Sequence, residues 1–313
     1  MEITSPRELV AAIPHLLGFV PEDSLVVVAL DNNDVHSMVR VDWPISQSVL
    51  QGSLARYAQS VATIEIVLCF YSDTEIDSYE SVSEVFCESD VLDVLTVKHG
   101  FWKSAMCEDS QCCPPEGRSL NEFTSIAATE FIFAGSSPFS SREDLVNTLA
   151  AESLSALARD ECKEAFASLH DITDIPQEVE WILRRVARKE SATWSDIART
   201  SVALQEIRVR DAVLRRAFES VDVRVTMRLW LMQILGRIPE ERVAACATVL
   251  AGIVWLDGNG SLARIALDRA LEADADYSLA QLLDTALVNA VPSRVWTESL
   301  EAVSYDECVR GAA

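Results

Sequence analysis

Residues 24–30 read SLVVVAL, and residues 63–70 read TIEIVLCF. Both are nearly unbroken apolar runs rich in β-branched residues, which is typical of strands buried on both faces of a sheet. The first run is followed by DNND (31–34), a turn sequence, and then by alternating residues over 35–42. These signals predict a hairpin and a second buried strand, the centre of a sheet.

Helix signals surround these strands. Ser5-Pro6-Arg7-Glu8 is a capping box with proline at the first helical position, so a helix starts there. We expect Pro14 to limit that helix, because the residue before a proline avoids helical angles. Residues 47–60 suit an amphipathic helix, and the acidic segment 73–90 suits another.

A second hairpin is expected downstream. The segments VLDVLTVK (91–98) and FWKSAMC (101–107) have strand character and are joined by His99-Gly100. The N-terminal part of the chain is therefore predicted to be an α/β domain with a mixed sheet and hairpins.

No strand pattern recurs in the second half of the chain. The stretch GSSPFSS (135–141) is the best candidate for a linker. We therefore predict an α/β domain over 1–135 and an all-helical domain over 136–313. The helices expected in the second half cover residues 141–168, 176–190, 193–218, 223–235, 239–256, 261–273, 277–290 and 293–303.

One helix pair has the spacing of a tetratricopeptide repeat. Residues 250–254 are followed by the turn Asp257-Gly258-Asn259-Gly260, and Ala263, Leu267 and Ala270 then fall at the offsets of the repeat. A shift of 34 residues gives no second match. An ordinary helical hairpin and a single repeat-like binding surface therefore both remain open.

Charge and composition exclude several classes of protein. The chain has 313 residues, 26 Lys and Arg, 49 Asp and Glu, and a formal net charge of −23. This argues against a protein that wraps nucleic acid or lies on an anionic membrane. The N-terminus lacks the features of a secretory signal, and no apolar stretch reaches the ~20 residues of a spanning helix. We expect a cytoplasmic protein with no membrane association.

The loop CEDSQCCPPEG (107–117) contains the residues most suited to metal binding or thiol chemistry. Cys107, Cys112 and Cys113 lie within seven residues, and His99 precedes them across the predicted hairpin. Thiolate and imidazole are the usual zinc ligands, and a closed site needs four of them. Three interpretations remain open: a proline-stiffened structural loop, a zinc site formed by these four residues, and a redox-active thiol pair. Apart from zinc, no cofactor is implied.

The middle of the chain is basic. Residues 181–242 contain 13 Lys and Arg against 8 Asp and Glu, whereas residues 1–180 contain 9 against 31. Nucleic acid binding is one interpretation, but pairing with acidic groups of the same chain or of a protein partner is favoured. The candidate partner-binding residues are Arg184, Arg185, Arg188, Arg208, Arg210 and Arg215.

Common catalytic signatures are absent from the sequence. It contains no P-loop, no GxGxxG, no GxSxG and no HExxH. By elimination, we favour a non-enzymatic interaction or regulatory module with a protein partner. The alternatives are a metal- or thiol-dependent enzyme that uses the loop at 107–113, and nucleic acid binding through 184–216.

Fragments across the whole chain resemble a known family. They are PHLLGFVPEDSLVVVAL (14–30), VRVDWP (39–44), WKSAMCEDSQCCPPEG (102–117), VRDAVL (209–214) and WLDGNGSLARIALDRALEADADYSLAQLL (255–283). Together they resemble the largely actinobacterial domain of unknown function 4192. The resemblance implies a cytoplasmic bacterial protein with one recurring architecture, and it implies no activity.

Overall fold

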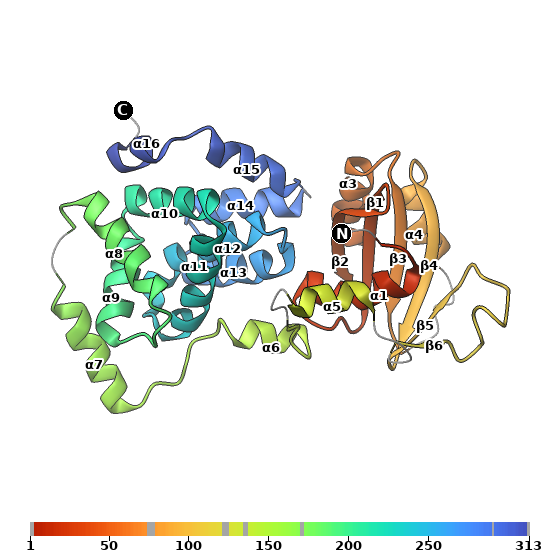
Figure 1. Cartoon of the computed structure of the whole chain (residues 1–313), viewed down its shortest axis with the longest axis horizontal. Coiled ribbons are helices and arrows are strands. Elements are labelled where there is room, and N and C mark those ends of the chain that lie inside the picture. The colour runs from red at the N-terminus through yellow and green to blue at the C-terminus, as the bar shows by residue number, and fades with distance from the viewer. Residues whose placement is uncertain are drawn as a thin grey trace. The chain divides into compact units, whose positions relative to one another are not determined.

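The computed structural model of the chain describes residues 3–73, 79–120, 125–133, 137–169, 172–289 and 291–311 (Figure 1). It contains two compact units whose main division falls between Asp144 and Leu145. Each unit is described by itself. The boundary predicted between residues 135 and 136 lies outside the described residues, as do residues 74–78 of the predicted acidic helix.

The first unit is built on a six-stranded sheet of order β2-β1-β3-β4-β5-β6. Neighbouring strands are antiparallel except for β3 and β4, so the sheet is mixed, as predicted. The strands are β1 (Ser24–Asp31), β2 (Asp34–Asp42), β3 (Glu65–Tyr71), β4 (Asp90–Lys98), β5 (Phe101–Ser104) and β6 (Arg118–Ser119).

Strand β1 is the buried centre of this sheet. Val27 pairs with Val39 of β2 on one side and with Leu68 of β3 on the other. Every residue from 25 to 29 is fully buried, which confirms the prediction from the unbroken apolar run. A strand of this kind needs cover on both faces, and helices supply it.

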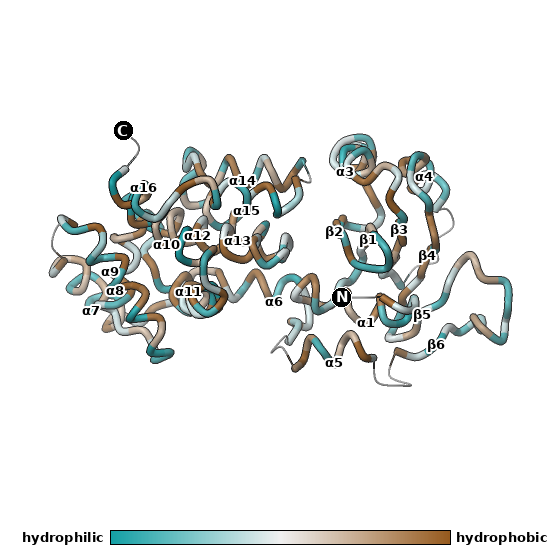
Figure 2. The backbone as a smooth tube through the Cα atoms, turned by 45° about the horizontal axis from the view of Figure 1, so that its top comes forward, coloured by the Kyte–Doolittle hydropathy of each residue, from teal (hydrophilic) through white to brown (hydrophobic). Residues whose placement is uncertain are grey.

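Two helical layers cover the sheet (Figures 1 and 2). Alternate residues of β1 and β3 share a hydrophobic core with Leu54, Tyr57, Val82 and Phe86. These four lie on the helical segments that connect the strands: α2 (Gln47–Val49), a π-helix (Leu50–Leu54), α3 (Ala55–Ser60), α4 (Glu80–Ser83) and a 3₁₀ turn (Glu84–Phe86). The opposite face carries α1 (Pro6–Leu17) and α5 (Ile126–Phe133).

Both predicted hairpins are present, and the backbone geometry of each turn explains which residues occupy it. Asn32 and Asn33 join β1 to β2 with φ of 51° and 66°, and His99 and Gly100 join β4 to β5 with φ of 51° and 77°. Two successive positive φ angles define the type I′ turn, whose twist matches that of the strands it joins. The β4–β5 turn thereby determines where His99 lies.

The sequence predicted that helix α1 would end near Pro14. The helix instead continues to Leu17. A proline inside a helix removes the N–H that would bond to the carbonyl four residues earlier. Here that carbonyl belongs to Val10, and it accepts the hydroxyl of Tyr71 at 3.5 Å instead. The lost bond is replaced from the sheet, so the helix passes through the proline. Gly18, with φ of 83°, ends it.

A carboxylate of α1 caps α5, a helix that the sequence did not predict. Glu8 Oε2 accepts the Ser125 hydroxyl at 2.7 Å and the Ala127 N–H at 2.8 Å, and Oε1 accepts the Ile126 N–H at 3.3 Å. These N–H groups have no partner within their own helix. Glu8 thus supplies, from more than 115 positions away, a cap that local sequence does not reveal.

The second unit is helical, and no strand lies in its described residues. Its helices are α6 (Arg142–Asn147, which spans the division), α7 (Ala156–Ala167), α8 (Ile175–Ala187), α9 (Trp194–Ala203), α10 (Ile207–Glu219), α11 (Val221–Ile234), α12 (Val243–Leu256), α13 (Gly260–Ala273), α14 (Ser278–Val288), α15 (Ser293–Glu301) and α16 (Tyr305–Arg310). Together with the mixed sheet of the first unit, they confirm the predicted fold class.

The long helix predicted over 141–168 is instead two helices, α6 and α7. Between them the Glu152 N–H donates to the Gly236 carbonyl at 2.6 Å. A side chain on Gly236 would meet the Ala150 carbonyl at 2.5 Å, so only glycine allows this close approach. The predicted helix 193–218 is likewise two, α9 and α10, because the chain turns at residues 204–206.

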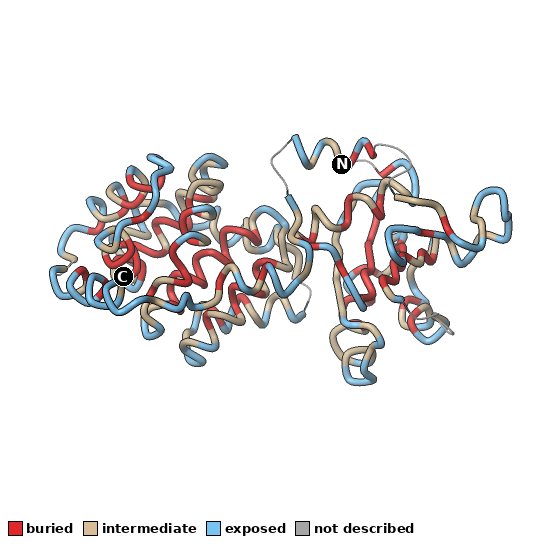
Figure 3. The backbone as a smooth tube through the Cα atoms, turned by 90° about the horizontal axis from the view of Figure 1, so that it is seen from below, coloured by how far each residue is buried: buried red, intermediate tan, exposed pale blue. Residues whose placement is uncertain are grey.

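Helix α12 is the core of the second unit (Figure 3). All of its residues from 243 to 255 are buried, as expected for a helix that is apolar all round. It forms a hairpin with α13 through a turn that contains Gly258, and Asn259 caps α13 by accepting the Leu262 N–H at 2.9 Å. Whether this hairpin acts as a tetratricopeptide unit stays a prediction. Within the described residues, no helix combines the length and apolar character needed to cross a bilayer.

The Glu8 cap makes a testable prediction about pH. Partial burial raises the pKa of Glu8, but hydrogen bonds from the start of α5 outweigh it and hold the pKa below its ordinary 4.5. A lowered pKa stabilises the fold above pH 4.5, and this stability is lost as the pH falls through the folded-state value. We expect Glu8→Gln to lower the free energy of unfolding at pH 7 by about 1 kcal/mol and to flatten its decline between pH 6 and pH 3.

The measurement is urea unfolding across that pH range, with exposed Glu65→Gln as the control. An acid profile of Glu8→Gln that is parallel to the wild type would show that the cap contributes no pH-dependent stability.

Candidate metal centre

The cysteine loop connects β5 to β6, the two short strands at one edge of the sheet. It extends away from the strands (Figure 1). Two tight turns shape it: the Cys113 N–H donates to the Asp109 carbonyl at 2.7 Å, and the Gly117 N–H donates to the Pro114 carbonyl at 2.8 Å. Gly117 has φ of 81°, and a side chain there would press on the Trp102 carbonyl at 3.0 Å. The loop therefore needs glycine where it rejoins the sheet.

Arg118 holds the loop from the adjoining strand. Its guanidinium donates to the carbonyl of Gln111 at 2.7 Å and to the carbonyl of Cys112. Two donors on one planar group fix the orientation of this segment. The thiols are thus carried on backbone that is tied at both turns and at β6.

Three of the four residues predicted to bind zinc come together in this loop. The Sγ atoms of Cys107, Cys112 and Cys113 all lie within 4.8 Å of one another. Cys112 is exposed, the other two are half-buried, and all three are free thiols. The turn from Asp109 to Cys113 folds the chain back and brings the adjacent pair beside Cys107. The cluster offers three sulfur ligands to a metal ion.

The surroundings of Cys113 raise the pKa of its thiol. Desolvation raises the pKa of the Cys113 thiol, the neighbouring thiols of Cys107 and Cys112 raise it further, and a hydrogen bond from the Ser104 backbone partly offsets this. Adjacent thiolates repel one another, and a bound divalent ion reverses that repulsion.

His99, the fourth predicted ligand, lies elsewhere. It occupies the β4–β5 turn, where its Nδ1 is 2.9 Å from Asp73 Oδ1, and it is not a member of the cysteine cluster. A type I′ turn directs this residue to the edge of the sheet at the end of β4, whereas the thiols lie beyond the far end of β5. His99 is near the three cysteines in sequence, but it is not near their thiols in the fold.

No motif in the sequence marks Asp73 or the cleft beside it as a site. A cleft of about 370 Å³ opens at the carboxyl ends of β3 and β4, and its lining includes Asp73, Lys98 and His99. Ligands of open α/β sheets gather at such ends. Predicting this cleft requires knowing that β3 and β4 are parallel. The apolar runs in the sequence do not reveal strand direction.

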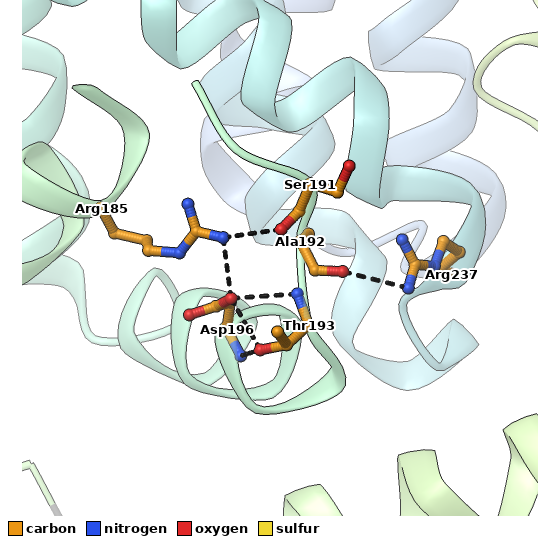
Figure 4. A network of polar contacts seen from close by, with 6 residues as sticks. All are labelled: Arg185, Ser191, Ala192, Thr193, Asp196 and Arg237. Atoms are coloured by element: carbon orange, nitrogen blue, oxygen red, sulfur yellow. Dashed lines mark hydrogen bonds and ion pairs between the residues drawn. The ribbon is translucent and has the colours of Figure 1, made fainter. Parts of the chain in front are cut away.

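Most of the predicted partner-binding arginines are paired within their own unit. Arg185, whose side chain is only 7% exposed, donates from Nη2 to Asp196 Oδ2 at 2.9 Å and to the Ser191 carbonyl at 2.8 Å (Figure 4). Its guanidinium lies over the Trp230 ring at 4.6 Å. Asp196 also accepts the N–H and hydroxyl of Thr193, completing the capping box of α9.

The remaining arginines follow the same pattern with one exception. Arg184 pairs with Glu180, Arg208 with Glu206, Arg210 with Asp211 and the Tyr277 hydroxyl, and Arg215 with Glu219. Arg188 is exposed at the C-terminal end of α8. The acids that neutralise the basic segment come from the same helical unit, and a partner-binding role for these arginines stays a prediction.

Fold and loop together define a protein in which an α/β unit carries a three-thiol loop and a helical unit follows. The chain belongs to the family described as Domain of unknown function (DUF4192), whose model matches residues 6–294. The match covers most of both units and every candidate residue discussed above. No curated protein and no solved structure matches the chain significantly.

The Arg185–Asp196 pair predicts a large effect on stability. Replacing Arg185 with Met leaves the Asp196 carboxylate, 15% exposed, without its cationic partner. We expect a loss of about 3 kcal/mol in the free energy of unfolding, the cost typical of breaking a buried pair.

Arg184→Met is the matched control, because Arg184 is the preceding residue on α8 and its side chain is 70% exposed. Chemical denaturation of both variants tests the prediction, which is wrong if the two lose similar stability.

Proposed function

We propose that this chain is a non-enzymatic interaction or regulatory protein whose first unit binds a zinc ion through Cys107, Cys112 and Cys113. The observation that carries the proposal is the convergence of the three thiols on a loop held by Arg118. The partner we expect is another protein.

Sulfur chemistry and spacing support zinc. Tetrahedral zinc with Zn–S bonds of about 2.3 Å separates its sulfur ligands by about 3.8 Å. The three Sγ atoms lie within 4.8 Å of one another, so they need to approach by about 1 Å at most to reach this spacing. Thiolates select zinc or other soft ions over calcium and magnesium. Metal-binding thiols must also stay reduced, so we propose that the protein works in the cytoplasm.

A binding role is favoured over catalysis by the surroundings of the thiols. Nucleophilic cysteines are commonly activated by an adjacent base, and His99, the histidine nearest to these cysteines in sequence, is instead beside Asp73. A metal ion would stiffen a loop that projects from the sheet, giving a surface of defined shape for a partner. A metal- or thiol-dependent enzyme remains the alternative.

Nucleic acid is the less favoured ligand. Phosphate binding needs cations that are available to the ligand, whereas five of the six candidate arginines are paired with carboxylates of the helical unit. Arg188, which is exposed at the C-terminal end of α8, is the member of this set best placed to meet a partner.

The zinc proposal predicts a metal content that depends on the loop. Protein purified without oxygen or chelator should contain near-stoichiometric zinc by elemental analysis, and Cys112→Ser should lose most of it. Cys87→Ser is the matched control, since Cys87 is an exposed free thiol of the same unit outside the cluster. Absence of zinc from the wild type, or equal loss in both variants, would overturn the proposal.

Arg118 provides an independent test. Groups that orient metal ligands typically contribute 10–100-fold to metal affinity. We expect Arg118→Gln to weaken zinc binding by about tenfold in competition with a chromophoric chelator, because the carbonyls of Gln111 and Cys112 lose their donor. The exposed Arg56→Gln should bind zinc like the wild type. An unchanged affinity in Arg118→Gln would show that the loop does not depend on this residue.

A further inference from the structure

The three-thiol loop leaves one zinc ligand to be supplied from outside the cluster. Resting on the proposed zinc site, we infer that the fourth coordination position takes a low-molecular-weight thiol, bound as its thiolate.

The cysteine cluster offers one ligand fewer than a closed zinc site needs. Zinc in proteins is four-coordinate, and closed structural sites have four protein ligands. Within the described residues, the cluster of candidate ligand atoms contains Cys107, Cys112 and Cys113 and no fourth His, Cys, Asp or Glu. Asp109, three positions before Cys112, uses its Oδ1 to accept the Gln111 N–H at 2.8 Å. The described part of the loop thus matches an open site.

The charge of the site determines what the open position accepts. Three thiolates around a divalent zinc ion leave a net charge of about −1, so the metal is a weak Lewis acid toward oxygen ligands. Soft sulfur ligands suit such an ion better than carboxylate or carbonyl oxygen. A fourth thiolate completes the all-sulfur set that is common in structural zinc sites.

Nearby cations offset the extra negative charge. Arg118 contacts the backbone of the thiol-bearing segment, and Lys103 Nζ donates to the Pro115 carbonyl at 3.3 Å. The acids of the same loop outnumber these cations, and Glu108, Asp109 and Glu116 are all exposed. This arrangement favours a thiol whose other end is cationic or neutral and disfavours one that carries a carboxylate.

Access is compatible with a small ligand. Cys112 is exposed and the other two thiols are half-buried, so a ligand reaches the metal from solvent. Binding forms one zinc–sulfur bond, releases a water molecule from the metal, and transfers the thiol proton to solvent. No group is oxidised or reduced.

The test uses the full chain loaded with cobalt(II), which replaces zinc and reports its ligands by absorption. The probes are cysteamine, 2-mercaptoethanol and 3-mercaptopropionate, three thiols of similar length with a positive, neutral and negative end. We expect a saturable increase in cobalt–thiolate charge-transfer absorption, with cysteamine bound about tenfold more tightly than 3-mercaptopropionate. Cobalt must remain with the protein after desalting. Cys87→Ser should respond like the wild type, and Cys112→Ser should not.

The outcomes separate this inference from the proposed function. If the wild type binds no cobalt, the zinc site itself is refuted. If cobalt binds with a three-sulfur spectrum that no thiol changes, the zinc site stands and the inference fails. A four-sulfur spectrum before any thiol is added also overturns the inference. In that case, dependence on protein concentration would identify a thiol of a second copy, and independence would identify a ligand from the same chain.

Discussion

Burial of β1 on both faces is the constraint on which the first unit depends. Residues 25–29 carry only apolar side chains and expose none of them, so both sides of the strand must be covered by other elements. The pairing of β1 with β2 and β3 supplies its edges. The core around Leu54 and Phe86 covers one face, and α1 with α5 covers the other. The remaining strands extend this sheet outward.

The candidate metal centre is placed by the edge of that sheet. β5 and β6 are short and lie farthest from β1, so the loop between them is free of the packing that determines the core. Arg118 and the two prolines, Pro114 and Pro115, give it a defined shape instead. Reactive side chains often lie on loops that a rigid scaffold positions, and three thiols near a rigid edge fit that pattern.

Most of the candidate arginines of the helical unit pair with carboxylates of the same unit. The excess of arginine over residues 181–242 left open whether the acids that pair with it belong to this chain or to a partner, and Arg185 lies buried against Asp196 and Trp230 of its own unit. The position of a charge along the chain does not reveal whether a carboxylate from another turn or helix meets it. Many of the basic groups therefore hold helices in place, whatever partner the unit binds.

Sequence by itself determined the elements whose signals are local. The apolar run at 24–30, the asparagines at 32 and 33 and the clustered cysteines specify a buried strand, a tight turn and a group of thiols over short distances. Only the tertiary structure decided the long-range pairs: Glu8 with the start of α5, Tyr71 with the carbonyl that Pro14 leaves unpaired, and His99 with Asp73. The physical reason is that the residues that specify a turn or a buried strand are close neighbours in the sequence. A cap, a replaced hydrogen bond or a ligand set depends instead on strand direction and on contacts between residues distant in the chain.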